Sequence, residues 1–511
     1  MGGTAQAGRE RTDEGWVTFV RRWILVLVLL LVPMAVLALL RVIPEIDKRF
    51  YSADGHLVVV SAIAACALIV ASLAAVAASR VPQPGVVWLG LGCTAVGVFM
   101  LGHGLLTPGV FGQPTNRWVG RLPYAALASF ALCLYIGGRR SDRGMNRWVS
   151  RHPVPTLLVP AVASIVFVAV LVADPVVFGG AEPFAHENTI LAALSAVIVV
   201  LLISVIWTHG HRWQLGHDTV QLAILLAAAM AIAAVFSFEH GRFAQVSWWD
   251  YHAYLLAGFG AAVYAVLLRR REQQTVSDLL TTTFDDDPFA HIVQGYPEAL
   301  NTLVRAVEVK DAYTHGHSQR TAQLAVELGL QMGLPPDRLR ILSRGAFLHD
   351  IGKIAIPDEI LNKPGRLTPE ERLVVETHPQ LGYELASSAP SLREVLQVIL
   401  HHHERMDGGG YPGGLVGRNI PFEARVVAVA DVWDALTSDR PYRDGWELPV
   451  ALAHIVDGRT SHFDPIVVDA LVQWAAARGI TPELGAGRAD EAWRAGETCH
   501  EVDPAREPVA V

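Results

Sequence analysis

The stretch "HHHERMDGGGYPGG" at residues 401–414 places three histidines and two acids directly before a glycine-rich turn. Imidazole nitrogens and carboxylate oxygens together suit iron or manganese, and less strongly zinc or nickel. Glycines relax the steric limits on the backbone, so they leave room beside such ligands. The pattern therefore predicts a metal site at the end of a helix, with space for a ligand or partner to approach.

Other metal-capable side chains recur along the C-terminal half. His349 and Asp350 lie in "FLHDIGK", where Lys353 follows at a spacing that shares one helix face. His378 precedes a proline suited to a first helical turn, and Asp434 follows Asp431 on the same face. Each of these residues alone is most often structural or solvated. Together they supply His317, His349, His378, His402, His403, Asp350 and Asp431. Such a set on successive helices predicts a di-metal site in a bundle core.

The chemistry that fits this set is hydrolysis of a phosphate ester. Two cations can share a hydroxide and clamp the oxygens of a phosphate. A lysine such as Lys353 would offset the charge that develops in the transition state. No serine or cysteine lies in a convincing triad setting, so no protein nucleophile is expected. Glu404 and Asp407 have two possible roles, either to orient ligand histidines or to cap the turn.

Five blocks in the order "KDAYTHGHSQR", "HDIGKIAIPDEILNKPGRLTPEE", "HP", "HHHERMDGGGYP" and "ADVWDALTSDRPYR" carry a resemblance to a known family. Residues 295–478 resemble the HD-GYP family, the cyclic di-GMP phosphodiesterase branch of the HD superfamily. The resemblance covers well under half of the chain and does not extend to its N-terminal half.

The resemblance implies a role for each matching residue. The metal ligands would be His317, His349, Asp350, His378, His402, His403 and Asp431, with Asp350 bridging two ions. Lys353 would contact a phosphate, and Arg440 and Arg443 would hold the nucleotide. Gly410 and Tyr411 lie in a loop linked with substrate access and with contacts to GGDEF diguanylate cyclases. Tyr313 stands where members with a third metal carry glutamate, so two ions are expected, iron or manganese.

The implied activity is hydrolysis of cyclic di-GMP to linear pGpG through a bridging hydroxide, with further cleavage to GMP left open. Two alternatives remain, a non-catalytic cyclic di-GMP receptor and an HD phosphohydrolase of another nucleotide. Every two-metal ligand is present, which favours catalysis over a receptor role. The net charge of −8 without a basic stripe argues against nucleic acid as a ligand.

The elements that must position these residues follow from hydropathy. The chain of 511 residues is 52% hydrophobic and 18% charged, whereas soluble proteins average about 25% charged. Charged residues are scarce from Ile24 to Leu268, which predicts a membrane half before a soluble half. Eight segments predict transmembrane helices, namely 24–40, 57–79, 86–106, 122–136, 155–173, 189–207, 219–238 and 251–268. The first is expected to be retained rather than cleaved.

The positions of basic residues predict the orientation. With the N-terminus inside, fourteen Lys and Arg residues fall on the inner side and six on the outer side. Both termini are therefore expected in the cytoplasm of a bacterium, with the spans in its inner membrane. Five histidines, His56, His103, His186, His240 and His252, would lie near the outer face. They are either solvated or part of a proton- or metal-sensing site, and Trp248 and Trp249 are expected to be interfacial anchors.

The remaining segments complete an all-α expectation, a polytopic helical membrane domain at 1–271 followed by an all-helical bundle. Residues 272–294 are polar and predict a cytoplasmic connector. Residues 295–478 show almost no strand pattern and predict successive helices, which include 369–386, 391–405 and 422–437. Residues 479–511 predict a disordered tail. Receptors of this layout are expected to signal as homodimers through 272–310. A transporter is not favoured, because the spans lack charged or broken-helix signs of a translocation path.

Overall fold

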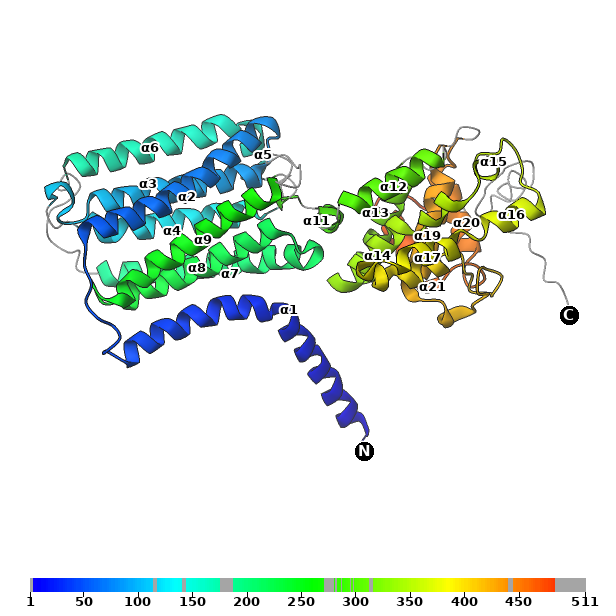
Figure 1. Ribbon diagram of the computed structural model, residues 1–511, viewed down its shortest axis with the longest axis horizontal. Helices are drawn as coiled ribbons and strands as arrows, with labels where there is room; N and C mark the ends of the chain where they lie inside the picture. The colour runs from blue at the N-terminus through cyan, green and yellow to red at the C-terminus, as the bar shows by residue number, and fades with distance from the viewer. Residues whose placement is uncertain are drawn as a thin grey trace. The chain divides into compact units, whose positions relative to one another are not determined.

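The computed structural model describes residues 3–113, 117–139, 144–174, 187–270, 280, 283–285, 287–294, 296, 298–311, 316–439 and 444–482. Within these ranges the ordered elements are helices, and the only strand-like pairing is three isolated bridges. The predicted all-α fold class is confirmed. The chain forms two compact units, Met1–Gln294 and Gly295–Val511 (Figure 1).

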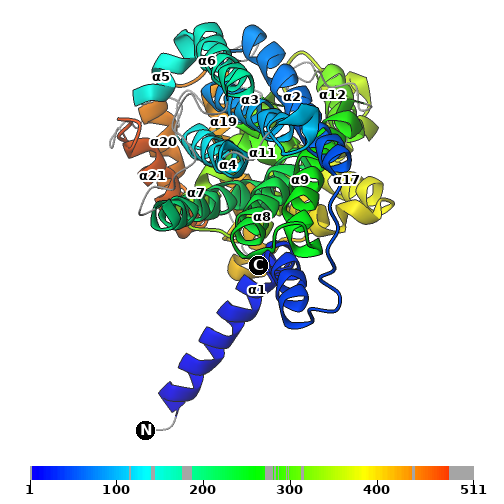
Figure 2. The same ribbon diagram turned by 90° about the vertical axis from the view of Figure 1, so that its left-hand side faces the viewer.

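The N-terminal unit is a bundle of long helices, seen nearly end-on in Figure 2. Its helices are α1 (Gly3–Val42), α2 (Ala53–Arg80), α3 (Pro84–Leu105), α4 (Trp118–Gly137), α5 (Gly144–Arg151), α6 (Pro153–Ala173), α7 (Glu187–Gly216), α8 (Thr219–His240) and α9 (Val246–Arg270), with the short η1 (Val110–Gly112) after α3. Small residues allow these helices to approach closely. A Cβ added to Gly97 would lie 2.5 Å from Leu68 of the neighbouring helix.

Seven helices of the described residues are long and apolar enough to cross a membrane, from the Trp23–Val42 part of α1 to α8. The sequence predicted eight spans, one more than this number. The eighth prediction, 251–268, falls on α9, which is 25 residues long and so has sufficient length. Its first turns carry the polar residues Asp250 and His252. Segment 122–136, the shortest prediction, lies within the 20-residue α4.

The aromatic residues at the start of α9 differ from expectation. Trp248 is only 8% exposed, and its indole stacks on His56 at 5.1 Å between ring centroids. Trp248 is thus packed inside the bundle, and its role as an interfacial anchor stays a prediction. Trp249 donates its indole N–H to the carbonyl oxygen of Phe50 at 2.8 Å. The tryptophans at this position therefore pack against neighbouring loops and helices.

The described part of the predicted connector packs on the helices of the N-terminal unit. Leu280, Phe284, Phe289 and Ile292 are buried, and helix α11 (Pro288–Gln294) contacts α7. A Cβ added to Gly85 would lie 2.5 Å from the ring of Phe284. The remaining connector residues, 272–279, 281–282 and 286, lie outside the described ranges.

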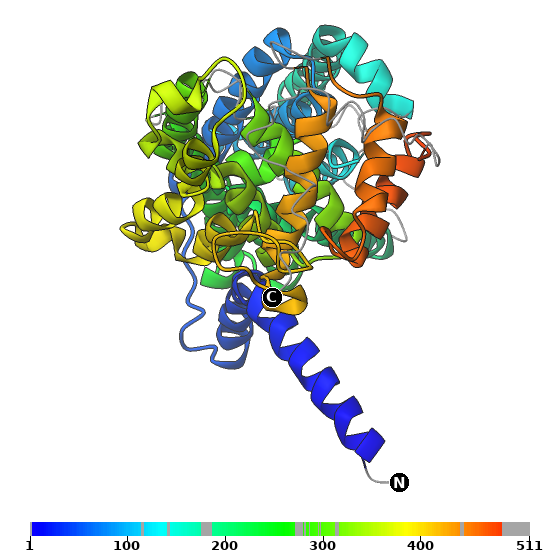
Figure 3. The same cartoon turned by 90° about the vertical axis from the view of Figure 1, so that its right-hand side faces the viewer.

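The C-terminal unit is a bundle of shorter helices (Figure 3). They are α12 (Glu298–Lys310), α13 (His317–Gln331), α14 (Pro336–Leu348), η2 (Ile351–Ala355), α15 (Asp358–Leu361), α16 (Pro369–Val375), α17 (His378–Ser387), η3 (Pro390–Val395), α18 (Leu396–His401), η4 (Gly417–Asn419), α19 (Phe422–Thr437), α20 (Leu448–Asp457) and α21 (Pro465–Ala476). Helix α19 is the central element, since it contacts α13, α14, α18, α20 and α21. Its residues from Val426 to Leu436 are all buried, which forms the core of the bundle.

Two predicted helical stretches are interrupted in the structure. The stretch 369–386 divides into α16 and α17, and the break lies just before His378 and Pro379. The stretch 391–405 divides into η3 and α18, and the helix ends at His401. Hydrophobic periodicity continues across both breaks, so it did not reveal them. Both interruptions occur beside histidines of the candidate site. The predicted tail from 483 onward lies outside the described residues.

Candidate metal centre

The seven predicted metal ligands converge in the core of the C-terminal unit. Most of them lie at helix ends: His317 begins α13, His349 and Asp350 follow α14, His378 begins α17, and His402 follows α18. Asp431 lies in the middle of the central helix α19. Helix ends place side chains where several elements meet. Six of the seven are buried, and His403 is partly exposed.

The first cluster consists of His317, His349 and Asp431. Their ligand atoms all lie within 4.8 Å of one another. His317 Nε2 lies 3.1 Å from Asp431 Oδ1, and His349 Nε2 lies 3.8 Å from the same oxygen. Two imidazoles and a carboxylate facing one point form a mixed nitrogen and oxygen donor set.

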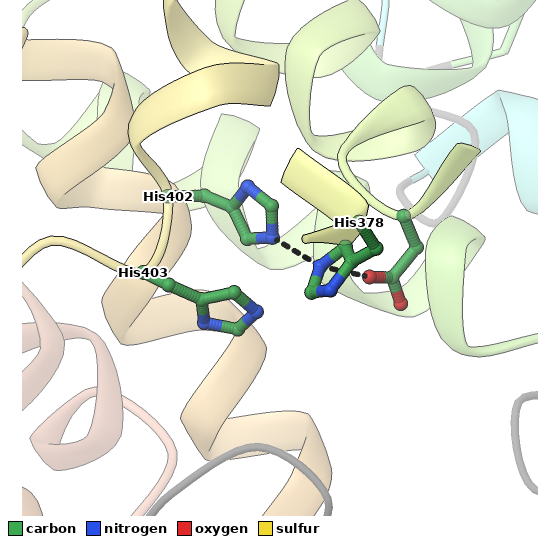
Figure 4. Close-up of side chains that lie close together, drawn as sticks. His378, His402 and His403 are labelled. Carbon is green, nitrogen blue, oxygen red and sulfur yellow. Dashed lines mark hydrogen bonds and ion pairs between the residues drawn. The ribbon is translucent and has the colours of Figure 1, made fainter. Parts of the chain in front are cut away.

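The second cluster consists of Asp350, His378, His402 and His403, again within 4.8 Å of one another. Figure 4 shows the rings of His378, His402 and His403 gathered from separate parts of the chain. His378 Nε2 lies 3.3 Å from Asp350 Oδ1. The other oxygen of Asp350, Oδ2, lies 3.3 Å from His349 Nε2 in the first cluster. Asp350 thus presents one oxygen to each cluster.

Hydrogen bonds to the Nδ1 atoms orient the rings. His349, His378 and His402 place Nδ1 at 2.6, 2.9 and 2.8 Å from the carbonyl oxygens of Ala346, Val375 and Ile399. A carbonyl oxygen only accepts, so Nδ1 carries a proton, and in its neutral form each ring turns the lone pair of Nε2 inward. His378 Nε2 and His402 Nε2 then face each other at 3.3 Å. A cation between them removes this repulsion, so the residues fit a metal.

The charges of the site also fit metal binding. Burial by itself would raise the pKa of Asp350, but His349 and Lys353 beside it hold that pKa well below its usual value. Asp350 therefore stays ionised. Burial, and then the neighbouring histidines His403, His349 and His378, hold the pKa of His402 well below its usual value. A neutral imidazole is the form that binds a metal ion.

Lys353 is buried among carboxylates. Its Nζ lies 2.8 Å from Asp350 Oδ2 and 3.3 Å from Asp311 Oδ2, and the residue is only 2% exposed. In this state the ammonium holds Asp350 in place and does not face open space. A close backbone contact supports the turn that carries it. A Cβ on Gly352 would lie 1.9 Å from the carbonyl oxygen of His378, so only glycine fits there.

Asp434 has a clear position in the site, although the sequence assigned it no role. Its Oδ2 accepts from His317 Nδ1 at 2.8 Å, and its two oxygens accept from Arg320 at 2.6 and 3.0 Å. Burial would raise the pKa of Asp434, but His317 and Arg320 hold it below its usual value. The signal in the sequence was its i+3 spacing from Asp431, which places both acids on one helix face.

The glycine-rich turn is held by Glu404 and Asp407. Glu404 accepts from the backbone N–H groups of Gly413 and Leu415 at 2.7 and 2.9 Å. Asp407 Oδ1 accepts from the N–H of Gly409 at 2.9 Å. Of the two roles that the sequence left open, the structure supports capping of the turn. His401 lies 3.5 Å from Glu404 and outside both clusters.

Gly410 and Tyr411 lie directly beside the second cluster. A Cβ on Gly410 would lie 2.5 Å from the carbonyl oxygen of His403 and 2.4 Å from the backbone nitrogen of Arg405. The backbone there is too closely packed for a side chain. The Tyr411 ring lies 4.8 Å from the His403 ring, between centroids. This loop therefore forms part of the wall beside the second cluster.

A hollow opens beside the clusters. Its lining includes His402, His403 and Asp431 of the clusters, Gly410 and Tyr411 of the turn, and Arg372, Arg405 and His462. Arg372 and Arg405 each pair with a carboxylate, and both bring positive charge to the wall. The predicted nucleotide contacts Arg440 and Arg443, and Tyr313 at the third-metal position, lie outside the described residues.

Comparisons with known proteins agree with this geometry. An HD domain family model matches residues 301–467. Over 181 residues the chain is 48% identical to the cyclic di-GMP phosphodiesterase response regulator RpfG of Xanthomonas campestris, with 35% of this chain and 48% of that protein covered. It is 41% identical over 233 residues to a cyclic di-GMP phosphodiesterase of Pseudomonas aeruginosa, covering 45% and 55%. A 3'3'-cGAMP-specific phosphodiesterase 2 of Vibrio cholerae is 36% identical over 180 residues, covering 34% of each.

The chain thus spans about half the length, or less, of the curated relatives that it matches. The matched region coincides with the C-terminal unit that holds the two ligand clusters. The motifs, the helical fold and the convergence of histidines and aspartates in this unit point to the same family. Residues 301–467 match an HD domain family model, and the resemblance of this region to cyclic di-GMP phosphodiesterases with an HD domain is confirmed.

Proposed function

We propose that the chain is a membrane-anchored, metal-dependent phosphodiesterase that hydrolyses cyclic di-GMP to linear pGpG. The observation that carries this proposal is the position of Asp350, whose two oxygens face two separate ligand clusters. That arrangement suits a pair of divalent ions, iron or manganese, with Asp350 shared between them. The names of the relatives supply the substrate class.

Separate residues would bind the two ions and orient their ligands. His317, His349 and Asp431 would hold one ion, and His378, His402 and His403 the other. Divalent ions held there would lower the pKa of water, so that hydroxide could attack a phosphodiester. They would also offset the charge of the phosphate. Lys353 keeps Asp350 ionised and in position, and Asp434 fixes the orientation of the His317 ring.

The substrate would enter from the hollow beside the clusters. Arg372 and Arg405 would attract its phosphates, and Arg440 and Arg443 are proposed to hold the nucleotide. Tyr411 offers an aromatic face in the same wall, next to His403. The closely packed backbone at Gly410 leaves the mouth of the site clear of an additional side chain. The same turn is proposed to contact GGDEF-domain proteins.

A second cyclic dinucleotide is a specific alternative substrate. The relatives include 3'3'-cGAMP-specific enzymes that are 36%, 38% and 34% identical to this chain. The cyclic di-GMP enzymes reach 48%, 41% and 40%, which favours cyclic di-GMP. A non-catalytic receptor is less well supported, because both ligand clusters are complete.

The membrane location rests on the apolar helices of the N-terminal unit. Seven of them meet the length and composition of spans, and α9 is proposed as the eighth. With eight spans, the basic residues favour the side that includes both termini. We place the spans in the bacterial inner membrane and the HD domain in the cytoplasm. A homodimer through the 272–310 region is part of the same proposal.

The test uses the full chain in detergent, purified without oxygen and loaded with Fe²⁺ or Mn²⁺. Cyclic di-GMP and 3'3'-cGAMP are supplied in parallel, and the products are separated by chromatography. Formation of pGpG by the parent and none by Asp350→Ala supports the proposal, and later appearance of GMP shows a second cleavage. Preferential cleavage of 3'3'-cGAMP would show that 3'3'-cGAMP, and not cyclic di-GMP, is the preferred substrate. Binding without cleavage would make the chain a receptor.

A further inference from the structure

Three histidines from separate helices meet inside the N-terminal unit, far in sequence from the HD domain. His56 lies near the start of α2, His103 near the end of α3, and His252 near the start of α9. His56 Nε2 lies 2.9 Å from His252 Nε2 and 3.1 Å from His103 Nε2. The three residues are 0–1% exposed. Of the other predicted outer-face histidines, His240 is exposed, and His186 lies outside the described residues.

The hydrogen bonds around two of these rings fix where their protons lie. His103 Nδ1 lies 2.6 Å from the carbonyl oxygen of Val119, which only accepts, so His103 carries its proton on Nδ1. Thr107 Oγ1 donates to the carbonyl oxygen of His103 at 2.8 Å. Its oxygen must therefore accept from His56 Nδ1 at 3.0 Å. Both neutral rings thus present unprotonated Nε2 atoms to each other.

Two lone pairs at 3.1 Å repel each other unless a cation or a hydrogen-bond donor lies between them, and the Tyr251 hydroxyl, 3.0 Å from His103 Nε2, can donate to one of them but not to both. A shared proton would create a buried imidazolium, which is costly without an anionic partner. Among the described residues, no ion pair joins a carboxylate to any of these three rings. A metal ion is the alternative, because imidazole nitrogens bind zinc, copper, iron and nickel without a protonated ring.

The third ring and its surroundings suit the same interpretation. His252 Nε2 lies 2.9 Å from His56 Nε2, so the third ring turns the same nitrogen toward the cluster. The Tyr251 hydroxyl lies 3.0 Å from His103 Nε2, beside the point where the three nitrogens converge. The rings of Trp248 and Trp249 lie 5.1 and 5.8 Å from the His56 ring and cover the cluster. The cluster is therefore sheltered from solvent.

We propose that His56, His103 and His252 bind a divalent first-row transition-metal ion, such as Zn²⁺, through their Nε2 atoms. Three histidines form a known zinc ligand set that leaves a fourth position for water or another oxygen ligand. The Tyr251 hydroxyl lies next to that position. Thr107 and the Val119 carbonyl act as outer partners that orient two of the ligands. This site is separate from the HD site and does not depend on the proposed enzymatic function.

Such an ion would join α2, α3 and α9 at one end of the bundle. Helix α9 is the last long helix before the C-terminal unit. The site lies at the N-terminal end of α9, which is the end farther along the chain from that unit. Its start is also tied to the segment after α1, since Asp47 accepts from the N–H and the hydroxyl of Ser247 at 2.8 and 2.9 Å. The occupant of the site would therefore control how this end of α9 is held.

The test measures metal per chain in the full protein in detergent. His349→Ala and His402→Ala disable the HD site, so that remaining metal reports on the second site. After equilibration with Zn²⁺ and removal of loosely bound ions, mass spectrometry should find one equivalent per chain. Adding His103→Ala should abolish it, whereas the exposed His240→Ala should leave it unchanged. The three histidines holding Co²⁺ should give the visible absorption bands of a tetrahedral ion.

A second variant guards against loss of folding in the His103 variant. Thr107→Val keeps all three ligands and removes one outer partner, a change that typically costs about 10–100-fold in metal affinity. We expect Zn²⁺ affinity to fall by that factor in the HD-disabled chain. Absence of Zn²⁺ in the HD-disabled parent overturns the proposal. Retention of Zn²⁺ in a folded His103→Ala variant, or unchanged affinity in Thr107→Val, also overturns it and leaves a hydrogen-bonded histidine cluster.

Discussion

Asp434 offers the sharpest test of how the HD site is organised, because it touches a predicted ligand without belonging to either cluster. Its carboxylate accepts from His317 Nδ1 and from both Nε and Nη2 of Arg320. In Asp434→Asn the side chain keeps one acceptor oxygen, and its amide N–H₂ then faces the donors of Arg320 or His317. The His317 ring loses the anion that fixes its orientation and raises the basicity of Nε2.

The expected loss is in metal affinity and only slightly in fold stability. Removing an outer partner of a ligand histidine typically weakens metal binding by about 10–100-fold, which corresponds to about 1.4–2.7 kcal/mol. The Arg320 side chain is 46% exposed, so its ion pair with Asp434 contributes no more than about 1 kcal/mol to stability. The metal-free protein should therefore unfold at nearly the temperature of the parent, while the metal-loaded protein should be stabilised less.

The assay is a competition between the protein and a metal chelator for Mn²⁺, combined with thermal unfolding in both metal states. Asp469→Asn is a matched control, because Asp469 also pairs with an arginine through two hydrogen bonds, at 2.5 and 2.9 Å, but lies on the exposed surface. It should leave metal affinity unchanged. Equal Mn²⁺ affinity in Asp434→Asn and in the parent would refute the role given to Asp434.

Three other changes have distinct expected outcomes. Gly410→Ala should lower turnover strongly, because its Cβ would lie 2.5 Å or less from three backbone atoms. Gly409→Ala should lower turnover less, because the nearest atom to its Cβ would be a side-chain oxygen at 3.1 Å. Turnover measured for both variants checks this difference. Lys353→Met should destabilise the metal-free protein by about 3–5 kcal/mol, because it removes a buried ammonium that lies between the buried carboxylates of Asp350 and Asp311. The partly exposed Lys363→Met is the control, and denaturant unfolding should show a loss of less than about 1 kcal/mol for it. Burial, and then a neighbouring arginine, lower the pKa of His462 to about 3 from 6.5. The unfolded chain binds more protons between these values, so stability should fall by up to about 1.4 kcal/mol per unit as pH drops below 6.5. His462→Gln should flatten that slope in unfolding measured from pH 7 to 4, and an unchanged slope would contradict the assignment.

The C-terminal half was largely predictable from its sequence, because its ligands are rare residue types in short motifs. His349 and Asp350 adjoin in one motif and His402 and His403 in another, so local spacing was informative. Helical periodicity also located the central helix α19. The breaks before His378 and after His401 were not predicted, since apolar periodicity continues through them.

The role of the turn was decided by backbone hydrogen bonds. The sequence left Glu404 and Asp407 between two roles, and the N–H groups that they accept from show that they cap the turn. Lys353 was expected at a phosphate, yet its ammonium lies between two buried carboxylates. Such contacts join residues far apart in the chain, and spacing alone carries no information about them.

The helical class, the apolar N-terminal half and the metal-capable residues of the C-terminal motifs could be predicted from the residues alone. These features depend on hydropathy, periodicity and side-chain chemistry, which are local properties. The packing of the helices was needed to show that Asp350 faces both clusters and that Asp434 orients His317. It also brought together His56, His103 and His252, which are separated by 47 and 149 positions along the chain. Helix packing sets such contacts, because it depends on how whole helices fit together and not on any short stretch of residues.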